Sequence, residues 1–326
     1  MGEYATNHAI KEQLNMRAFA FDAFGQPGSI HEVPEPEPAE GQVRVRVAAA
    51  ALNPFDNAVL GGYLKDRMEH RFPLIPASDF SGTIDAVGSG VHGFSAGDPV
   101  FGVTGKMFVG EGVLAEKTTA SAGTIAKRPQ SLSDVDAAAL SLAGVSALMC
   151  VDAAALKPKD VVVVIGASGG IGSYAVQLAK LRGAHVIGVT HTANLGYVTG
   201  LGADEVVDRT AGSVADALEA QHGSGVAAII DTGSDAASLA ALSAVVRNGG
   251  TVVSMKGAAA RDELAKRGVK GINVQTQMNT ERLEALAELA AAGKLKAPRI
   301  HKFPLDKAGE AFKILGQTDG KIVVTI

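Results

Sequence analysis

A glycine-rich turn in the middle of the chain has residue types and spacing suited to chemistry. Residues 161–172 read VVVVIGASGGIG, an apolar run followed by the turn. The segment GASGG at 166–170 fits the G-x-S-x-G elbow that presents a nucleophilic serine in α/β-hydrolases. The segment ASGGIG at 167–172 instead fits a dinucleotide fingerprint with alanine in the first glycine position. The turn alone does not decide between a nucleophile and a phosphate-binding loop.

Three alternatives to dinucleotide binding fit the chain poorly. A hydrolase needs an acid and a histidine after the serine, and Asp231 and His301 occur in that order. Its elbow, however, normally follows several earlier strands of the same sheet. Residues 166–172 also resemble the cofactor turn of short-chain dehydrogenases, which need Tyr-x-x-x-Lys, but no tyrosine here has lysine four residues later. A P-loop needs Gly-Lys followed by Ser or Thr, and the sequence lacks it.

The surroundings of the turn favour a dinucleotide site. A strand is expected to end at Ile165 and a helix to begin at Ile171, so that free N–H groups and the positive end of the helix dipole face a pyrophosphate. Gly172 lets this helix pack closely on the strand. Ser168 is then a turn residue rather than a nucleophile. The cofactor loop is predicted to consist of Ala167, Ser168, Gly169, Gly170 and Ile171.

The chain changes character at about Leu132. Beyond it, short apolar strands alternate with helical segments; strands are expected at 161–165, 185–189, 205–208, 226–231, 251–255 and 271–275, and an amphipathic helix at 281–290. Such a series is typical of a parallel sheet covered by helices on both faces. The first third is rich in Val, Gly and Pro, and predicts a mostly β domain of short strands, such as 42–47. Short strands at 298–304 and 321–326 are expected to rejoin that domain.

Composition excludes several classes of protein. The 326 residues, 47% hydrophobic and 20% charged, are enough for two domains with cores of their own. A net charge of −4 without a long Lys/Arg block argues against a nucleic-acid partner. The single cysteine, Cys150, excludes an internal disulfide and is expected to be a buried, inert thiol. Residues 1–15 lack the apolar core of a signal peptide, and no run of about 18 apolar residues occurs, so we expect a cytoplasmic protein without a membrane segment.

Further motifs occur in order between residues 16 and 326. They are LNPFD at 52–56 with Gly62-Tyr63, SGTIDAVGSGVHGFSAGD at 81–98, AGVSA at 143–147, GASGGIGSYAVQLAKLRGAHVIGVT at 166–190 with LGAD at 201–204, and GKIV at 320–323. With these motifs the chain resembles the medium-chain dehydrogenase/reductase superfamily, in its zinc-independent quinone oxidoreductase branch, which includes zeta-crystallin.

The resemblance implies an α/β protein with two domains. A mostly β, GroES-like catalytic domain would comprise residues 16–131 and 294–326, and a Rossmann NADP(H)-binding domain with a doubly wound parallel sheet would comprise residues 132–293. Residues 1–15 would be an extension. A cleft is expected at the junction of the domains, and a homodimer joined through the Rossmann domains near 250–255 or 271–275.

The resemblance also implies an enzyme without catalytic zinc. Zinc members place cysteine where this chain has Asn53, and Gly-His-Glu where it has Ala-Ser-Asp at 77–79. Of these residues only Asp79 could be a ligand, and a catalytic zinc ion takes three protein ligands. The eight histidines form no H-x-H or H-E-x-x-H pair, so surface or packing roles are expected for most of them. No metal site is predicted.

The end of the second Rossmann strand favours NADPH over NADH. An NAD site usually has Asp or Glu there for the ribose, whereas residues 189–194 read VTHTAN. Hydrogen-bond donors suit a 2′-phosphate better than a carboxylate does. Similar quinone reductases have a lysine near this point, which the present chain lacks. The candidate contacts are Thr190, His191, Thr192 and Asn194, with Tyr197 either adding a hydroxyl or packing against the adenine side.

Other candidates are placed around the reacting groups by the resemblance. Asn53 either donates its amide N–H to a substrate carbonyl or forms a turn before proline, and Asp56 orders that loop by hydrogen bonds. Tyr63 either donates a proton or orients substrate, or else is a buried aromatic at the cleft edge. Ser146 either binds the nicotinamide carboxamide or caps a helix turn. The remaining candidate cofactor contacts are Thr232, Ser254 and Lys321.

The expected function is NADPH-dependent hydride transfer to a quinone or an α,β-unsaturated carbonyl compound, a small molecule, without metal. Two alternatives stay open. A 2-enoyl thioester reductase would use a basic rim, such as Lys65, Arg67 and Arg71, for a phosphopantetheine or CoA tail. A cofactor-binding protein with little turnover would bind NADPH without consuming it.

Overall fold

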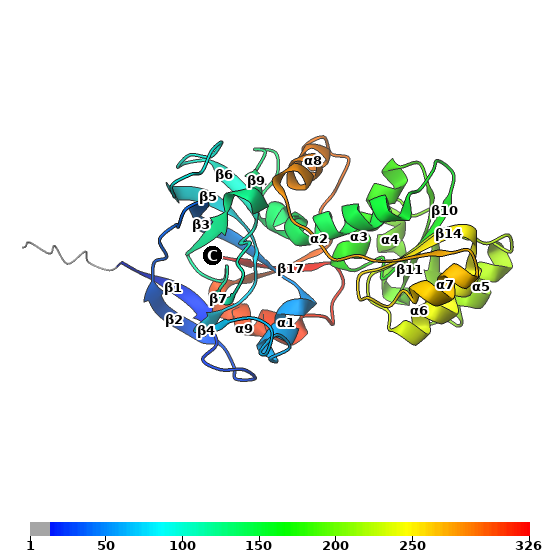
Figure 1. Ribbon diagram of the computed structural model, residues 1–326, viewed down its shortest axis with the longest axis horizontal. Helices are drawn as coiled ribbons and strands as arrows, with labels where there is room; N and C mark the ends of the chain where they lie inside the picture. Colours follow the sequence, from blue (N-terminus) through cyan, green and yellow to red (C-terminus); the bar gives the residue numbers. More distant parts are fainter. Residues whose placement is uncertain (1–13) are drawn as a thin grey trace, which may run out of the picture.

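The computed structural model describes residues 14–326, which form two lobes with a long helix between them (Figure 1). The extension predicted at 1–15 falls mostly on residues outside the described part, and Asn15 already begins the first strand. The first lobe contains β1 (Asn15–Ala20), β2 (Ser29–Pro34), β3 (Gln42–Leu52), β4 (His70–Ile75), β5 (Asp79–Val87), β6 (Pro99–Val103), β7 (Val109–Glu111), β8 (Lys117–Ser121), β9 (Ile125–Lys127), β16 (Ile300–Pro304) and β17 (Lys321–Thr325).

A seven-stranded sheet forms the first lobe, in the order β16-β17-β3-β5-β6-β9 with β8 also paired to β3. β17 pairs with β3 in antiparallel register, Val323 opposite Ala51, so the end of the chain rejoins the N-terminal strands as predicted. Two small sheets, β1-β2 and β4-β7, complete the lobe. The mostly β domain predicted for the first third is therefore present.

β3 shows why the alternation of residues 42–47 predicts only part of a strand. Val43, Val45 and Val47 are buried, while Arg46 between them is exposed. The strand then continues to Leu52 through alanines that are buried on both faces. Ala49 and Ala51 pack against a helix of the second lobe. The continuation lacks alternation because both faces are covered.

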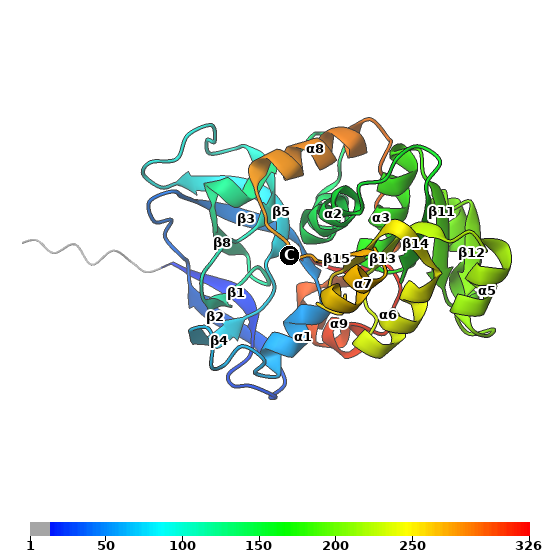
Figure 2. The same cartoon turned by 45° about the vertical axis from the view of Figure 1, so that its right-hand side comes forward.

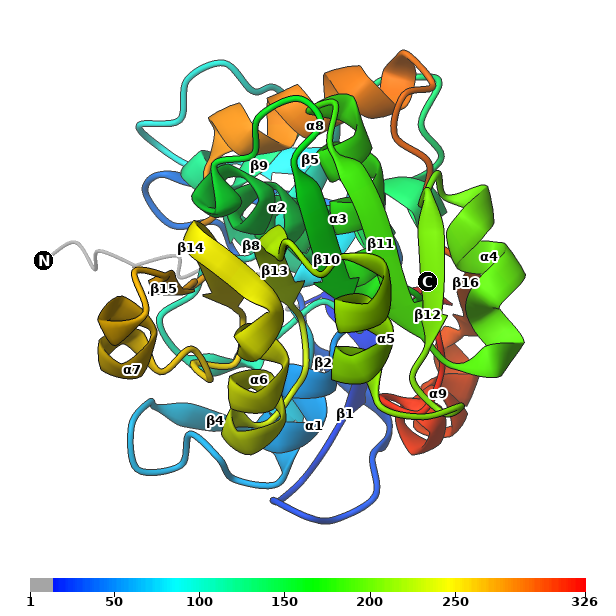
Figure 3. The same cartoon turned by 90° about the vertical axis from the view of Figure 1, so that its right-hand side faces the viewer.

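The second lobe is a six-stranded parallel sheet with helices on both faces (Figure 3). Its strands are β10 (Val161–Ile165), β11 (His185–Thr190), β12 (Glu205–Asp208), β13 (Val226–Asp231), β14 (Val246–Ser254) and β15 (Lys270–Asn273), in the spatial order β12-β11-β10-β13-β14-β15. The helices of the chain are α1 (Pro54–Leu60), α2 (Asp134–Ala154), α3 (Gly170–Leu181), α4 (Leu195–Gly200), α5 (Val214–Gln221), α6 (Ala236–Leu242), α7 (Arg261–Lys266), α8 (Thr280–Ala291) and α9 (Ala308–Ile314), with short 3₁₀ turns η1 (Ala122–Thr124), η2 (Thr192–Asn194), η3 (Ser243–Val245) and η4 (Leu305–Lys307).

Alternate residues of the central strand β10 pack in two separate cores. Val162 and Val164 pack with the helices α2, α3 and α8, whereas Val163 and Ile165 pack with α5, α6 and α7. Successive side chains of a strand point to opposite faces, so a strand covered on both sides is apolar throughout. The run VVVV in the sequence is the signature of this arrangement. The α/β fold class is confirmed.

The helix α2 lies between the two lobes and is apolar on every side. Ala138 and Ala139, near its start, pack on the first sheet, while Cys150, near its end, lies in the core of the second lobe. By length and composition α2 could cross a membrane, although its apolar residues are interrupted by polar ones. In this protein 78% of the apolar stretch of α2 is buried inside the molecule. The helix α8 lies over α2 and packs in the same core (Figure 2). Burial also raises the pKa of Cys150 to about 12, in keeping with an inert thiol.

Candidate active site

The glycine turn between β10 and α3 has the close packing of a phosphate cradle. Gly166 has φ +74°, a conformation that side-chain-bearing residues rarely adopt. A Cβ atom on Gly172 would lie 2.1 Å from the carbonyl oxygen of Gly166, so only glycine lets α3 approach the turn. α3 begins at Gly170, one residue earlier than predicted, with Gly169 as its N-cap. Its first N–H groups are therefore available to a pyrophosphate, and the residues fit a dinucleotide.

A cleft runs past this turn at the carboxyl ends of β10, β11 and β13. The edge of a doubly wound sheet where strand order reverses is the usual place for a dinucleotide. The C-terminal segment closes the other side, because Gly320 N–H donates to the carbonyl oxygen of Ser168 at 2.8 Å. The lining residues are Ile165, Gly166, Ser168, Gly169, Val189, Thr190, His191, Asn194, Arg209, Thr232, Gly233, Ser234, Gly316, Gln317, Thr318 and Asp319.

Ser168 connects the glycine turn to Thr190 at the end of β11. Its hydroxyl accepts hydrogen bonds from Thr190 Oγ1 at 2.8 Å and from Asn194 Nδ2 at 3.4 Å. Ser168 is 7% exposed, and no histidine contacts its Oγ among the hydrogen bonds of the described residues. It is held as a turn residue, as predicted, and its two partners lie beside the cofactor loop.

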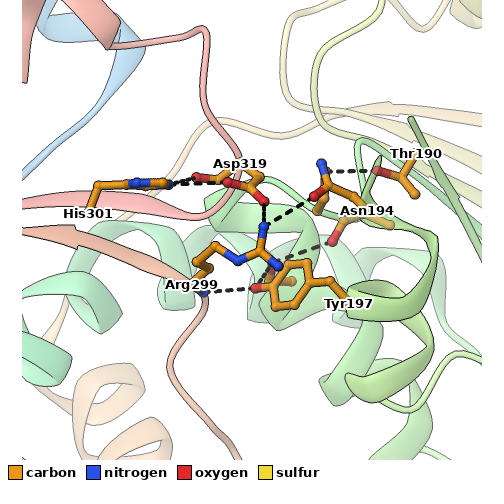
Figure 4. Close-up of polar contacts among 9 residues, drawn as sticks. Thr190, Asn194, Tyr197, Arg299, His301 and Asp319 are labelled. Atoms are coloured by element: carbon orange, nitrogen blue, oxygen red, sulfur yellow. Dashed lines mark hydrogen bonds and ion pairs between the residues drawn. The ribbon is translucent and has the colours of Figure 1, made fainter. Parts of the chain in front are cut away.

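Arg299, which precedes β16, joins the C-terminal segment to the cofactor cleft (Figure 4). Its guanidinium group lies 4.6 Å from the centre of the Tyr197 ring, pairs with Asp319 and contacts Asn194 Oδ1 at 3.3 Å. The Tyr197 hydroxyl accepts the backbone N–H of Arg299 at 2.9 Å and also contacts Ser173. Tyr197 therefore holds the two lobes together and is not among the residues that line the cleft.

Arg209 is a candidate cofactor residue that sequence reasoning missed. It directly follows β12 and lines the cleft, and its Nε lies 3.0 Å from Nε2 of His191. The preceding carboxylate, Asp208, accepts hydrogen bonds from Thr192 and Thr210 and does not line the cleft. The sequence contains a signal for it. Arg209 follows the third strand of the parallel sheet, and residues 190–194 follow the second, so both lie at the carboxyl ends of neighbouring strands.

Lys321 forms a buried network with the loop after β3. Its ammonium group donates to Asn53 Oδ1 at 2.7 Å and to the carbonyl oxygen of Leu52 at 3.0 Å, and lies 3.7 Å from Asp79 Oδ2. The amide nitrogen of Asn53 donates to Asp79 at 3.1 Å. Lysine can only donate and an ionised aspartate only accept, so both ends of the Asn53 amide are fixed. One amide hydrogen of Asn53 is thus committed to Asp79, and donation to a substrate stays a prediction for the other.

Burial shifts the pKa values of the two charged groups in this network. Asp79 is fully buried and Lys321 is 5% exposed. Burial raises the pKa of Asp79 and lowers the pKa of Lys321, and the attraction between the two opposes both changes. The stem of Lys321 also lies against the cofactor loop, because a Cβ atom on Gly170 would be 2.7 Å from its Cδ. Lys321 therefore contacts the cofactor loop through its stem and the loop after β3 through its ammonium group.

A second pocket lies in the first lobe, beside the loop that carries Asn53. Its walls are largely apolar, and its polar groups include Asp56 and the buried ammonium of Lys106, which donates to the carbonyl oxygen of Glu111 at 2.8 Å. The lining residues are Phe55, Asp56, Val59, Leu64, Met68, Ile75, Pro76, Ala77, Ser78, Thr104, Lys106, Phe108, Val109, Gly110, Glu111 and Gly112. An apolar pocket with a few polar groups suits a small organic substrate.

Comparison with known proteins agrees with this arrangement. The family described as alcohol dehydrogenase GroES-like domain matches residues 39–130, and the family described as zinc-binding dehydrogenase matches residues 201–324. The chloroplast envelope quinone oxidoreductase homolog of Arabidopsis thaliana is 35% identical, over 95% of this chain and 98% of the relative. The NADPH-dependent alkenal/one oxidoreductase of Arabidopsis thaliana is 29% identical, over 89% and 73%. The solved quinone oxidoreductase from Coxiella burnetii superposes with a TM-score of 0.86 at 29% identity, over 96% of this chain and 100% of that one.

This chain is a quinone oxidoreductase-like member of the medium-chain dehydrogenase/reductase superfamily. It is an oxidoreductase that uses a nicotinamide cofactor, which sets aside a binding protein without turnover. The glycine cradle of this oxidoreductase fits the cofactor. The network at Asn53, Asp79 and Lys321 does not fit a catalytic zinc ion, because it holds one carboxylate, one amide and a lysine.

Asp56 has two positions of interest in this oxidoreductase, one in the loop after β3 and one at the wall of a pocket. Its carboxyl group accepts the backbone N–H of Asn53 at 2.8 Å, which orders the loop as predicted. Asp56 also lines the apolar pocket of the first lobe. Burial raises the pKa of Asp56 to about 7, against the lowering effect of the hydrogen bond from Asn53. The carboxyl group therefore carries a proton over part of the neutral range, which suits an acid catalyst.

Tyr63 lies beside the pocket of the first lobe but is not one of its lining residues. It is 60% exposed, so it is not the buried aromatic that the sequence allowed. Its ring stands edge-on to Phe55 at 6.3 Å and 5.8 Å from the Arg67 guanidinium. Tyr63 does not line the substrate pocket, although Phe55 does. Its role as proton donor stays a prediction.

The hydroxyl groups of three further candidates form hydrogen bonds within the protein. Ser146 lies within α2, where it does not cap the helix, and its hydroxyl contacts Thr276 Oγ1 at 2.7 Å. Ser254 is fully buried and donates to Asp231 at 3.1 Å. Thr232 lines the cofactor cleft and donates to the carbonyl oxygen of Ile165 at 2.8 Å. Of the three, only Thr232 lines the cleft.

Proposed function

We propose that this oxidoreductase reduces quinones or α,β-unsaturated carbonyl compounds with NADPH and without a catalytic metal. The observation that carries the proposal is the Lys321 ammonium group, which lies between Asn53 and Asp79, at 2.7 Å and 3.7 Å. By the resemblance, Asn53 and Asp79 stand at zinc-ligand positions of the zinc members, and here a cation of the chain itself lies beside both. The names of the relatives, a quinone oxidoreductase homolog and an alkenal/one oxidoreductase, support the same substrate classes.

The residues of the chain would bind, orient and protonate the substrate. The bound cofactor supplies the hydride. Phe55, Leu64 and Phe108 line the pocket with apolar surface that excludes water from the substrate. Asp56 would hold a proton beside that surface and deliver it to the oxygen or carbon that gains negative charge. Lys321 and Asp79 are positioning residues, because they fix the Asn53 amide and hence the loop that carries Asp56.

NADPH rather than NADH is supported by basic groups at the end of β11 and β12. Arg209 and His191 line the cleft side by side, and Asn194 is contacted by Arg299. Charge-assisted hydrogen bonds from a guanidinium group suit the 2′-phosphate. This arrangement supplies the positive charge that the missing lysine near residue 194 would have provided.

Arg209→Ala tests that preference. The KM for NADPH is expected to rise about tenfold, because one charge-assisted hydrogen bond is lost, while the KM for NADH changes little. Steady-state kinetics with both cofactors measures the ratio. Arg182→Ala is the matched control, since Arg182 lies at the far end of α3 and pairs with Asp152. An equal rise for both cofactors would contradict a contact to the 2′-phosphate.

The basic rim invoked for a thioester tail is partly neutralised. Arg71 pairs with Glu69 at 2.8 Å and with Glu111 at 3.0 Å, and Arg67 lies over Tyr63. These contacts favour a carbonyl substrate over a long phosphorylated tail. A homodimer through β15, the edge strand of the parallel sheet, and a cytoplasmic location remain proposals from the sequence.

Cofactor consumption with a panel of acceptors tests the proposed function. The absorbance of NADPH, and separately NADH, is followed with 1,4-benzoquinone, 9,10-phenanthrenequinone, 2-hexenal and crotonyl-CoA, with the uncatalysed rate subtracted. We expect consumption of NADPH with a quinone or with hexenal, and the same rate after EDTA treatment. Activity confined to crotonyl-CoA would favour the thioester reductase. Loss of activity with EDTA, restored by zinc, would contradict a metal-free site.

A further inference from the structure

Three potential metal ligands meet at the edge of the parallel sheet opposite the cofactor cleft. His185 begins β11, Glu205 begins β12, and His222 follows α5. β11 and β12 are neighbouring parallel strands, so their first residues lie at the same edge (Figure 3). The cofactor cleft lies at the other ends of these strands, beyond Thr190 and Asp208. The cluster is therefore separate from the catalytic site.

The potential ligand atoms of this cluster lie close together. Nε2 of His185 lies 2.5 Å from Oε1 of Glu205, and Nε2 of His222 lies 3.2 Å from Oε2. One ligand atom from each residue lies within 4.8 Å of the others. Atoms bound to a tetrahedral zinc ion at about 2.0–2.2 Å are about 3.3–3.6 Å apart. Small side-chain rotations would bring the three groups to that spacing.

The groups beside the cluster orient its imidazoles. Each oxygen of the Glu205 carboxylate faces one imidazole, Oε1 that of His185 and Oε2 that of His222. Asp204 Oδ2 lies 3.8 Å from the other ring nitrogen of His185, as a carboxylate that orients a metal-bound histidine would. Lys180, in the same surface pocket, is paired with Asp204 at 2.6 Å.

We propose that His185, Glu205 and His222 bind one divalent transition-metal ion, with solvent completing its coordination. Two imidazoles and one carboxylate are a ligand set for zinc or cobalt rather than for magnesium or calcium, which prefer oxygen. Lys159 lines the same pocket, and its charge disfavours weakly held cations. The bound ion links β11, β12 and the end of α5, and so stabilises this edge of the sheet.

Metal titration of the full-length chain, prepared without a polyhistidine tag and stripped with EDTA, tests the site. We expect one equivalent of Zn²⁺ by calorimetry, Co²⁺ absorption typical of low coordination number, and a rise in Tm with Zn²⁺. His222→Asn and Glu205→Gln should each weaken Zn²⁺ binding by at least about tenfold and abolish the rise in Tm. His92→Asn is the matched control, because His92 is exposed in the loop between β5 and β6.

Each outcome decides for or against the site. Absence of a stoichiometric ion in the wild type, or equal binding by the wild type and both variants, would overturn it. Equal loss in His92→Asn would place the ion elsewhere and also overturn it. Circular dichroism and NADPH binding show whether each variant is folded, and the Co²⁺ spectrum of the wild type stands even if one variant is not. NADPH consumption after EDTA treatment should stay unchanged, since the ion lies away from the reaction.

Discussion

Replacing Lys321 with methionine is expected to lower the free energy of unfolding by about 3–5 kcal/mol. Asp79 is fully buried, and its carboxylate lies 3.7 Å from the Lys321 ammonium. Methionine fills much of the same volume but leaves the buried Asp79 carboxylate without its cation and the Asn53 amide oxygen without its donor. Denaturant unfolding at neutral pH, followed by circular dichroism, measures the loss.

A double variant identifies the cause of that loss. Adding Asp79→Asn to Lys321→Met should recover at least half of the lost stability, because it removes the uncompensated charge. Lys302→Met, on the neighbouring strand β16, is the matched control; Lys302 is exposed and its replacement should change stability by no more than about 0.5 kcal/mol. If Lys321→Met costs less than about 1 kcal/mol, the pair behaves like one on the surface, and the account of the network is wrong.

Asp56→Asn is expected to lower kcat/KM about 100-fold and to remove a pH dependence centred near pH 7. Below about pH 7 the carboxyl group of Asp56 holds its proton and can donate it, and above that pH it is ionised. The wild-type rate should therefore be level at lower pH and fall as the pH rises through about 7. Asparagine can still accept the N–H of Asn53, so the loop keeps its hydrogen bond. A pH–rate profile of both proteins with an enone acceptor is the measurement.

The free energy of unfolding of both proteins, measured at the same pH values, separates a proton donor from an acid that has a raised pKa without a catalytic role. The pKa of Asp56 is higher in the folded state than its ordinary value of about 4, so ionisation favours the unfolded chain. The wild type should lose stability as the pH rises from about 4 to about 7, and Asp56→Asn should not. If this stability difference appears while the variant keeps the wild-type rate profile, Asp56 has a raised pKa but is not the donor.

The sequence predicted the elements and the glycine turn between β10 and α3 because both depend on local patterns. β12 and β13 have the predicted bounds, and the amphipathic helix predicted at 281–290 is α8. β14 begins at Val246, before the predicted 251, because Val246 already pairs with Val226 of β13. The Asn-Gly-Gly at 248–250 lies in the register shift before the next pair, Ala228 with Thr251, and Gly249 has φ +76°. Local spacing thus predicts the order of elements better than their ends.

The polar networks depend on contacts between distant parts of the chain, which spacing does not reveal. Lys321 is 268 residues from Asn53, and Arg299 is 102 residues from Tyr197. The cluster of His185, Glu205 and His222 has no local histidine motif, because its three members come from three elements. Tyr63 was placed at the cleft by resemblance, but the exposure of a loop residue depends on the path of the loop.

The position of β17 between β16 and β3 also has a consequence for biosynthesis. A ribosome makes the N-terminal strands first, and the parallel sheet of the second lobe is complete before β16 and β17 emerge. The catalytic sheet cannot close until residues 321–325 are free of the exit tunnel, since they contribute Ile322, Val323 and Val324 to the interior. Until then the edge of β3 that β17 pairs with is open to chaperones and to other unfinished chains. The order of synthesis thus makes the cofactor domain the first to mature and the catalytic lobe the last.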